Sequence, residues 1–122
     1  MKIALANLPW QYFGMTGVRA GSRWPHLKGP TERDYLPFPF FLAYAASLLK
    51  KHSFDVTLID AIAEEMSYGY FLKLIHKLKP DILVCETSTV TLNHDLKLLS
   101  KIDNGVDIAL CGPDVNIRQP LF

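Results

Sequence analysis

Lys2-Ile3-Ala4-Leu5-Ala6-Asn7-Leu8-Pro9-Trp10, residues 2–10, decides the fold of this chain. Residues 2–7 predict a buried strand because they are mostly apolar, and Pro9 cannot continue a central strand. Residues 11–36 follow and contain four glycines, three arginines and Trp24. Structureless loops of that length are usually functional or disordered. We therefore expect residues 11–36 to form an irregular loop that is one wall of a ligand site.

Strand-like and helix-like segments alternate along the rest of the chain. Strands are predicted over residues 2–7, 55–60, 81–85 and 106–111, and helices over residues 40–52, 67–79 and 92–102. This alternation predicts a parallel sheet with right-handed crossovers. The predicted fold class is α/β, a flavodoxin-like (Rossmann-like) three-layer α/β/α domain with a parallel sheet of order 2-1-3-4. The pattern lacks a fifth strand, and periodicity is weak after Pro113.

Composition excludes several classes of protein. The 122 residues make one domain, 1–122, with 13 basic and 12 acidic residues. We expect no nucleic-acid partner, because that function needs a basic surface. No run approaches the ~20 apolar residues of a membrane span, and no signal peptide begins the chain. We therefore expect a cytoplasmic protein, in which Cys85 and Cys111 are reduced and buried.

The unusual residues of the chain converge on one edge of the predicted sheet. Ligands of doubly wound sheets bind at the carboxyl ends of the strands, where the strand order reverses. In the order 2-1-3-4, this point lies between the first and third strands. The predicted binding residues are Leu8, Pro9, Trp10, Arg19, Arg23, Trp24, Glu86, Thr87, Ser88, Thr89, Thr91, Gly112 and Pro113.

Two parts of this predicted site have ordinary structural alternatives. The hydroxyl groups of residues 87–91 precede a helix, where they could hold a phosphate or amide group or could simply cap the helix. Residues 17–25 combine glycines, two arginines and Trp24, and could cover a broad planar ligand. Alternatively, they form a surface loop that Trp24 pins to its own domain.

Several familiar cofactor motifs are absent from the sequence. No Gly-x-Gly-x-x-Gly follows the first strand and no Gly-Lys-Ser/Thr occurs, so dinucleotide and nucleoside triphosphate sites rank low. A receiver domain needs acidic residues where this chain has Asn7-Leu8-Pro9, and a flavin mononucleotide site needs hydroxyl groups there. Two cysteines without further spaced ligands do not make a zinc or iron–sulfur site.

In short blocks, the sequence resembles the N-terminal cobalamin-binding domain of the B12-binding radical SAM proteins. Residues 2–10 resemble the opening strand of that family and its Asn-x-Pro exit. Residues 21–25, Gly-Ser-Arg-Trp-Pro, resemble a loop of the members near the hopanoid-associated and magnesium-porphyrin cyclase-like proteins. Further similar blocks cover residues 36–46, 54–61, 80–84 and 110–113.

The resemblance implies base-off cobalamin, with the corrin ring across the carboxyl ends of the strands and the dimethylbenzimidazole tail between the first strand and residues 87–91. The signature Cys-x-x-x-Cys-x-x-Cys is absent. S-adenosylmethionine and a 4Fe-4S cluster would therefore belong to a radical SAM catalytic domain in cis that is missing here. The chain would be a fragment that binds without turnover, and the parent a methyltransferase or cyclase-like enzyme.

The cobalt-ligating motif Asp-x-His-x-x-Gly of other cobalamin domains is also absent. His26-Leu27-Lys28-Gly29 comes nearest, with Trp24 in place of the aspartate. A metal-bound histidine needs a second-shell partner for its other ring nitrogen. We therefore expect His26 to be a solvent-facing loop residue and no metal ligand in this chain, with His26 as a cobalt ligand the less favoured alternative.

A cofactor-free flavodoxin-like module for protein interaction or regulation is the alternative function. In that interpretation the loop over residues 11–36 is a docking surface. In either case the fourth strand would be an exposed sheet edge, and such edges pair with other chains. We therefore predict a homodimer through this edge at high concentration.

Overall fold

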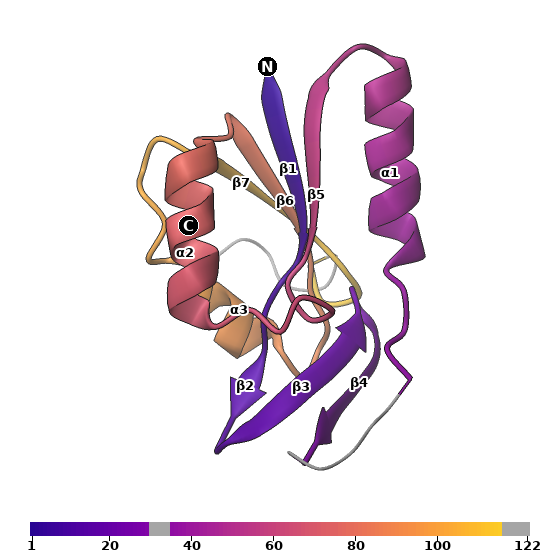
Figure 1. Ribbon diagram of the computed structural model, residues 1–122, viewed down its shortest axis with the longest axis vertical. Helices are drawn as coiled ribbons and strands as arrows, with labels where there is room; N and C mark the ends of the chain where they lie inside the picture. Colours follow the sequence, from indigo (N-terminus) through magenta and orange to yellow (C-terminus); the bar gives the residue numbers. More distant parts are fainter. Residues whose placement is uncertain (30–34, 116–122) are drawn as a thin grey trace.

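The computed structural model describes residues 1–29 and 35–115. It is a mixed α/β structure in which a parallel four-stranded sheet, a small antiparallel sheet and three helices account for the described elements (Figure 1). These elements are β1 (Lys2–Asn7), β2 (Gln11–Tyr12), β3 (Met15–Ala20), β4 (Arg23–Lys28), α1 (Phe40–Lys51), β5 (Asp55–Asp60), α2 (Tyr68–Leu78), β6 (Ile82–Glu86), α3 (Leu92–Leu99) and β7 (Asp107–Cys111).

The parallel sheet has the order β5-β1-β6-β7. These four strands correspond to the second, first, third and fourth of the strands predicted from the sequence. The strand labels differ from the predicted order 2-1-3-4 because β2, β3 and β4 come between β1 and β5 in the chain. β1 pairs with β6 in parallel, from Ile3↔Ile82 to Ala6↔Cys85. The predicted contact between the first and third strands is therefore confirmed. The arrangement is consistent with a Rossmann-like fold.

Helices cover both faces of the parallel sheet (Figure 1). On one face, α2 and α3 contribute Phe71, Ile75, Leu98 and Leu99 to a core that includes Leu83 of β6. On the other face, α1 packs through Leu42 and Ala46. The outer side of α1 stays apolar and exposed, with Phe40, Phe41, Tyr44 and Leu48.

Helix ends follow from local side-chain chemistry. Ser67 caps α2 as predicted, because its hydroxyl accepts a hydrogen bond from the Tyr70 backbone N–H at 3.2 Å. The prediction that α3 extends to residue 102 is wrong, since it ends at Leu99. The Ser100 hydroxyl donates to the Lys97 carbonyl oxygen at 3.0 Å, which favours a turn over another helical turn.

The prediction of an irregular loop over residues 11–36 is wrong for residues 11–28. They form the antiparallel sheet β2-β3-β4, which lies beyond the carboxyl ends of β1 and β6 (Figure 1). Gly14 and Gly21 have φ angles of 77° and 60° and make the two turns of this sheet. Residues 30–34 lie outside the described residues.

β7 forms an edge of the parallel sheet and pairs with β6 from Ile82↔Asp107 to Glu86↔Cys111. Its residues are mostly exposed. Residues 116–122, which include the weakly periodic end of the chain, lie outside the described residues. Among residues 1–29 and 35–115, no helix has the length and apolar character to cross a membrane.

Candidate functional site

The carboxyl edge of the parallel sheet brings most of the predicted site residues into one region. The exits of β1 and β6 lie side by side, and the Thr87 backbone N–H donates to the Cys111 carbonyl oxygen of β7 at 2.8 Å. The small antiparallel sheet covers this edge, and the Asn7 side chain joins the antiparallel sheet to the parallel sheet. Asn7 Nδ2 donates to the Arg19 carbonyl oxygen at 3.0 Å, and its Oδ1 accepts from the Gly21 N–H at 3.0 Å.

Arg19 of β3 is fully buried across the exits of β1 and β6. Its two terminal nitrogens donate to the two carboxylate oxygens of Asp95, both at 2.8 Å. They also donate to the Leu8 carbonyl oxygen at 3.1 Å and to the Thr91 hydroxyl. Arg19 thus occupies the place between β1 and residues 87–91 where the sequence predicts the tail of a ligand.

Three of the hydroxyl groups before α3, those of Ser88, Thr89 and Thr91, make hydrogen bonds within the protein. Thr91 Oγ1 lies 2.8 Å from Ser88 Oγ and donates to the Asp95 carboxylate at 2.8 Å. Ser88 and Thr91 are both buried, whereas Thr89 is exposed and reaches Asp114 at 3.4 Å. These hydroxyl groups therefore anchor the Arg19–Asp95 ion pair and the start of α3.

Glu86 connects the end of β6 to the turn between β3 and β4. Its Oε1 accepts from the Ser22 hydroxyl at 2.5 Å and lies 3.8 Å from Arg23 Nη1. A Cβ atom at Gly21 would overlap this carboxylate, so the turn requires glycine both for its positive φ and for this close approach. The Arg23 guanidinium also lies 3.7 Å from the centre of the Phe41 ring on α1.

Four buried polar atoms at this edge have no hydrogen-bond partner among the described residues. They are Trp10 Nε1, Arg19 Nε, Glu86 Oε2 and Thr87 Oγ1. An unpaired buried polar group costs about 1–3 kcal/mol, so native proteins rarely keep one without a water, an ion or a functional reason. Within the described chain, the unpaired buried side-chain atoms therefore gather at the predicted ligand edge.

The remaining predicted binding residues differ in their exposure to solvent. Leu8 and Pro9 are buried, and Trp10 packs against Gly17 of β3 so closely that a Cβ there would overlap its ring. Arg23 and Gly112 are half-buried, whereas Trp24, 64% exposed, and Pro113 face solvent. Trp24 therefore does not pin residues 17–25 to the domain. The ligand roles of all these residues stay predictions.

His26 is exposed on β4, and its Nδ1 lies 2.9 Å from the Trp24 carbonyl oxygen. In the part of the chain that the structure describes, no group of three or more His, Cys, Asp and Glu side chains is arranged to hold a metal ion.

The two cysteines lie in different environments. Cys85 is buried, and burial, with a smaller contribution from Asp95, raises the pKa of its thiol far above the ordinary range. The prediction that Cys111 is buried is wrong, because it lies on the exposed edge strand β7. Partial burial and the nearby Glu86 carboxylate raise the pKa of Cys111 too. Neither thiol therefore resembles an activated nucleophile, which requires a lowered pKa.

Asp95 is the site residue that sequence reasoning missed. In α3 it lies three residues after Leu92 and three before Leu98, both of which are buried. An aspartate at helical spacing within an apolar face is a signal of a buried partner, because buried charges are paired. The partner, Arg19, lies 76 residues away in the chain, and no local pattern identifies it.

Comparison with known proteins gives one informative similarity. One relative is described as a methyltransferase. The chain is 33% identical over 87 residues to a protein of Pyrococcus horikoshii described as "Uncharacterized methyltransferase PH0819". The match covers 68% of this chain but 18% of the length of that protein. No family model matches the chain, and no solved structure matches it.

Proposed function

We propose that this chain is the cobalamin-binding module of a longer, methyltransferase-related protein of the B12-binding radical SAM type. Its fold in this proposal is flavodoxin-like, with the corrin ring at the carboxyl edge of the parallel sheet. The cluster of unpaired buried atoms on Trp10, Arg19, Glu86 and Thr87 carries the proposal. The similarity to part of a methyltransferase supports it.

The residues at this edge fit parts of such a ligand. Cobalamin carries amide side arms around its ring, and Glu86 Oε2 and Thr87 Oγ1 could accept from amide N–H groups, while Trp10 Nε1 could donate to an amide oxygen. Trp24 offers an exposed flat ring beside the half-buried Arg23. When bound, cobalamin would supply methyl-carrier or radical chemistry, and this chain would supply position and surroundings.

The nucleotide tail does not fit between β1 and residues 87–91 in this conformation, because the Arg19 guanidinium fills that space. Trp10 and Glu86 also lie against β3 and the β3–β4 turn. Cobalamin binding in the proposed place therefore requires the small antiparallel sheet to shift away from the carboxyl edge. S-adenosylmethionine and a 4Fe-4S cluster belong, in this proposal, to a catalytic domain elsewhere in the parent protein.

An anaerobic titration with hydroxocobalamin or methylcobalamin tests the proposal. Binding as proposed displaces the dimethylbenzimidazole from cobalt and gives the visible spectrum of base-off cobalamin, with a saturable dependence on protein concentration. Unchanged spectra and unchanged tryptophan fluorescence at high protein concentration would contradict it.

A cofactor-free docking module is the second candidate function, and α1 favours it. Phe40, Phe41, Tyr44 and Leu48 are each more than half exposed on one helix. Clusters of exposed apolar side chains commonly mark protein interaction sites. A chain that binds no cobalamin, and that loses association with the rest of its parent protein when Phe40 and Tyr44 become serine, would support this function instead.

A further inference from the structure

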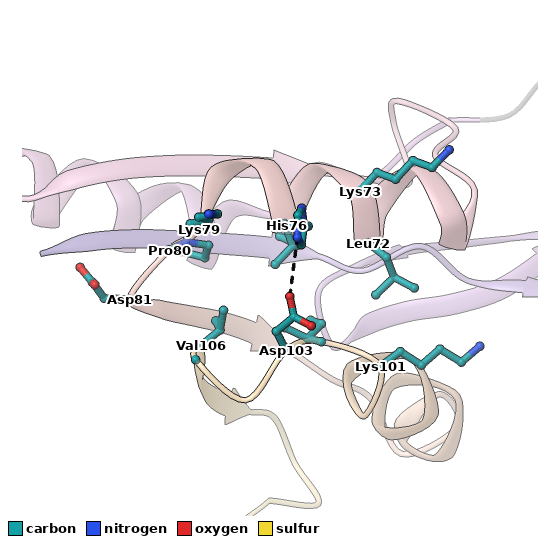
Figure 2. Close-up of a pocket in the computed structure, with 12 residues that line it drawn as sticks. Leu72, Lys73, His76, Lys79, Pro80, Asp81, Lys101, Asp103 and Val106 are labelled. Atoms are coloured by element: carbon teal, nitrogen blue, oxygen red, sulfur yellow. Dashed lines mark ion pairs between the residues drawn. The ribbon is translucent and has the colours of Figure 1, made fainter.

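A cavity lies at the amino edge of the parallel sheet, at the far end of the strands from the candidate site. Its volume is about 530 Å³, and it opens between α2 and the loop that joins α3 to β7 (Figure 2). Cavities of ~300–1,000 Å³ accommodate small molecules and cofactors. The space is therefore large enough for a ligand of metabolite size.

The cavity lies beside α2 and the segment that follows α3. α2 continues to Leu78, whereas α3 ends at Leu99 and the chain reaches β7 through a loop. The floor of the space is apolar and belongs to the core under α2 and α3. It is formed by Leu72, Ile75, Pro80, Ile102 and Val106.

The rim of the cavity is basic. The rim also carries two acids: Asp103 lies 3.9 Å from His76, which forms an ion pair only when it is protonated, and Asp81 accepts from the Lys2 backbone N–H at 2.6 Å. Over residues 1–29 and 35–115, no ion pair involves the ammonium groups of the three lysines at the rim. These lysines are Lys73, Lys79 and Lys101.

We propose that this cavity binds an amphiphilic anion, a small molecule with an apolar body and a phosphate, sulfonate or carboxylate group. Figure 2 shows Leu72 directed into the space between α2 and the loop, whereas Lys73 on α2 and Lys101 on the loop extend outward at one end of this space. The apolar body packs on the floor, where burial is worth roughly 25 cal/mol per Å². The flexible lysine side chains reach the anionic group as mobile point charges.

A titration of the ¹⁵N-labelled chain with 1-anilinonaphthalene-8-sulfonate, followed by NMR, tests this inference. Amide signals of residues 72–80 and 101–106 are expected to shift in a saturable way. Replacing two exposed lysines removes charge without touching the core, so Lys73→Gln/Lys101→Gln is expected to fold normally. It should raise the Kd about two- to thirtyfold, as expected from two surface ion pairs of ~0.2–1 kcal/mol each.

Two controls separate charge from general hydrophobicity. Lys50→Gln/Lys51→Gln removes the same charge from the end of α1 and should leave the Kd unchanged. N-phenyl-1-naphthylamine has the same aromatic body without the sulfonate, and its weaker binding should not respond to the Lys73 and Lys101 changes. The inference is overturned if the signals that shift belong to α1, or if both double variants bind the sulfonate like the unaltered chain. Neither result depends on whether the carboxyl edge binds cobalamin.

Discussion

The buried ion pair between Arg19 and Asp95 gives the sharpest stability prediction. Their side chains are 0% and 1% exposed, and two hydrogen bonds of 2.8 Å join them. Removing one partner of such a pair leaves an uncompensated buried charge and costs about 3–5 kcal/mol. A 122-residue domain has a total unfolding free energy of about 6–18 kcal/mol, so Arg19→Met or Asp95→Leu should remove a large share of it.

Urea unfolding followed by circular dichroism measures this effect. Each single variant should unfold at a much lower urea concentration with a similar m-value. The double variant Arg19→Met/Asp95→Leu should cost at least about 2 kcal/mol less than the sum of the two, because apolar residues can replace a buried ion pair. Lys97→Met, on the exposed side of α3, is the matched control and should stay within about 0.5 kcal/mol. Additive effects of the two single changes, each below about 1 kcal/mol, would refute the ion pair.

Further predictions concern the turns, the thiols and the sheet edge. Gly21→Ala should destabilise the chain by at least about 1 kcal/mol more than Gly14→Ala, because both have positive φ but only a Cβ at Gly21 would overlap Glu86; equal losses would contradict this. Ellman's reagent should label Cys111 but not Cys85 in the folded chain. Burial raises the pKa of the Cys85 thiol above its ordinary 9.0, so this thiol ionises at a lower pH in the unfolded chain than in the folded one. The free energy of unfolding should therefore fall above pH 9, by up to about 1.4 kcal/mol per pH unit. Cys85→Ala should reduce this pH dependence. Light scattering should show a mass that rises with concentration as β7 edges pair, and a monomer at high concentration would count against that.

The parallel sheet could largely be predicted from the sequence, because β1 and β6 are mostly apolar runs and β5 is a short segment bounded by acids. The predicted ranges 2–7 and 55–60 coincide with β1 and β5. The ends of α1 and α2 also followed from local signals, such as Ser67 before α2 and the lysines at the end of α1. These features depend on hydrophobic pattern and capping, which act over short distances along the chain.

The small antiparallel sheet and the ion pair between Arg19 and Asp95 could not be predicted from the sequence in this way. Gly14 and Gly21 make the turns of this sheet, but Arg19 in β3 and Trp24 and Pro25 in β4 interrupt the alternation of apolar and polar residues expected of strands. Arg19 is predicted as a ligand contact because it lies in the glycine-rich segment that follows the first strand. Its burial depends on Asp95, and a pairing across 76 residues arises only when the tertiary structure forms.

Thr87 allows the most direct test of cobalamin binding at the carboxyl edge. Its buried Oγ1 has no partner among the described residues, so Thr87→Val keeps the shape and should not reduce stability. Thr57→Val, in the middle of β5, is the matched control. If cobalamin binds here, hydroxocobalamin should give a base-off spectrum with the unaltered chain and with Thr57→Val. It should bind at least about fivefold more weakly to Thr87→Val, which corresponds to the loss of one hydrogen bond of ~1 kcal/mol. Equal binding by all three proteins, or base-off spectra from none of them, would contradict the proposed site.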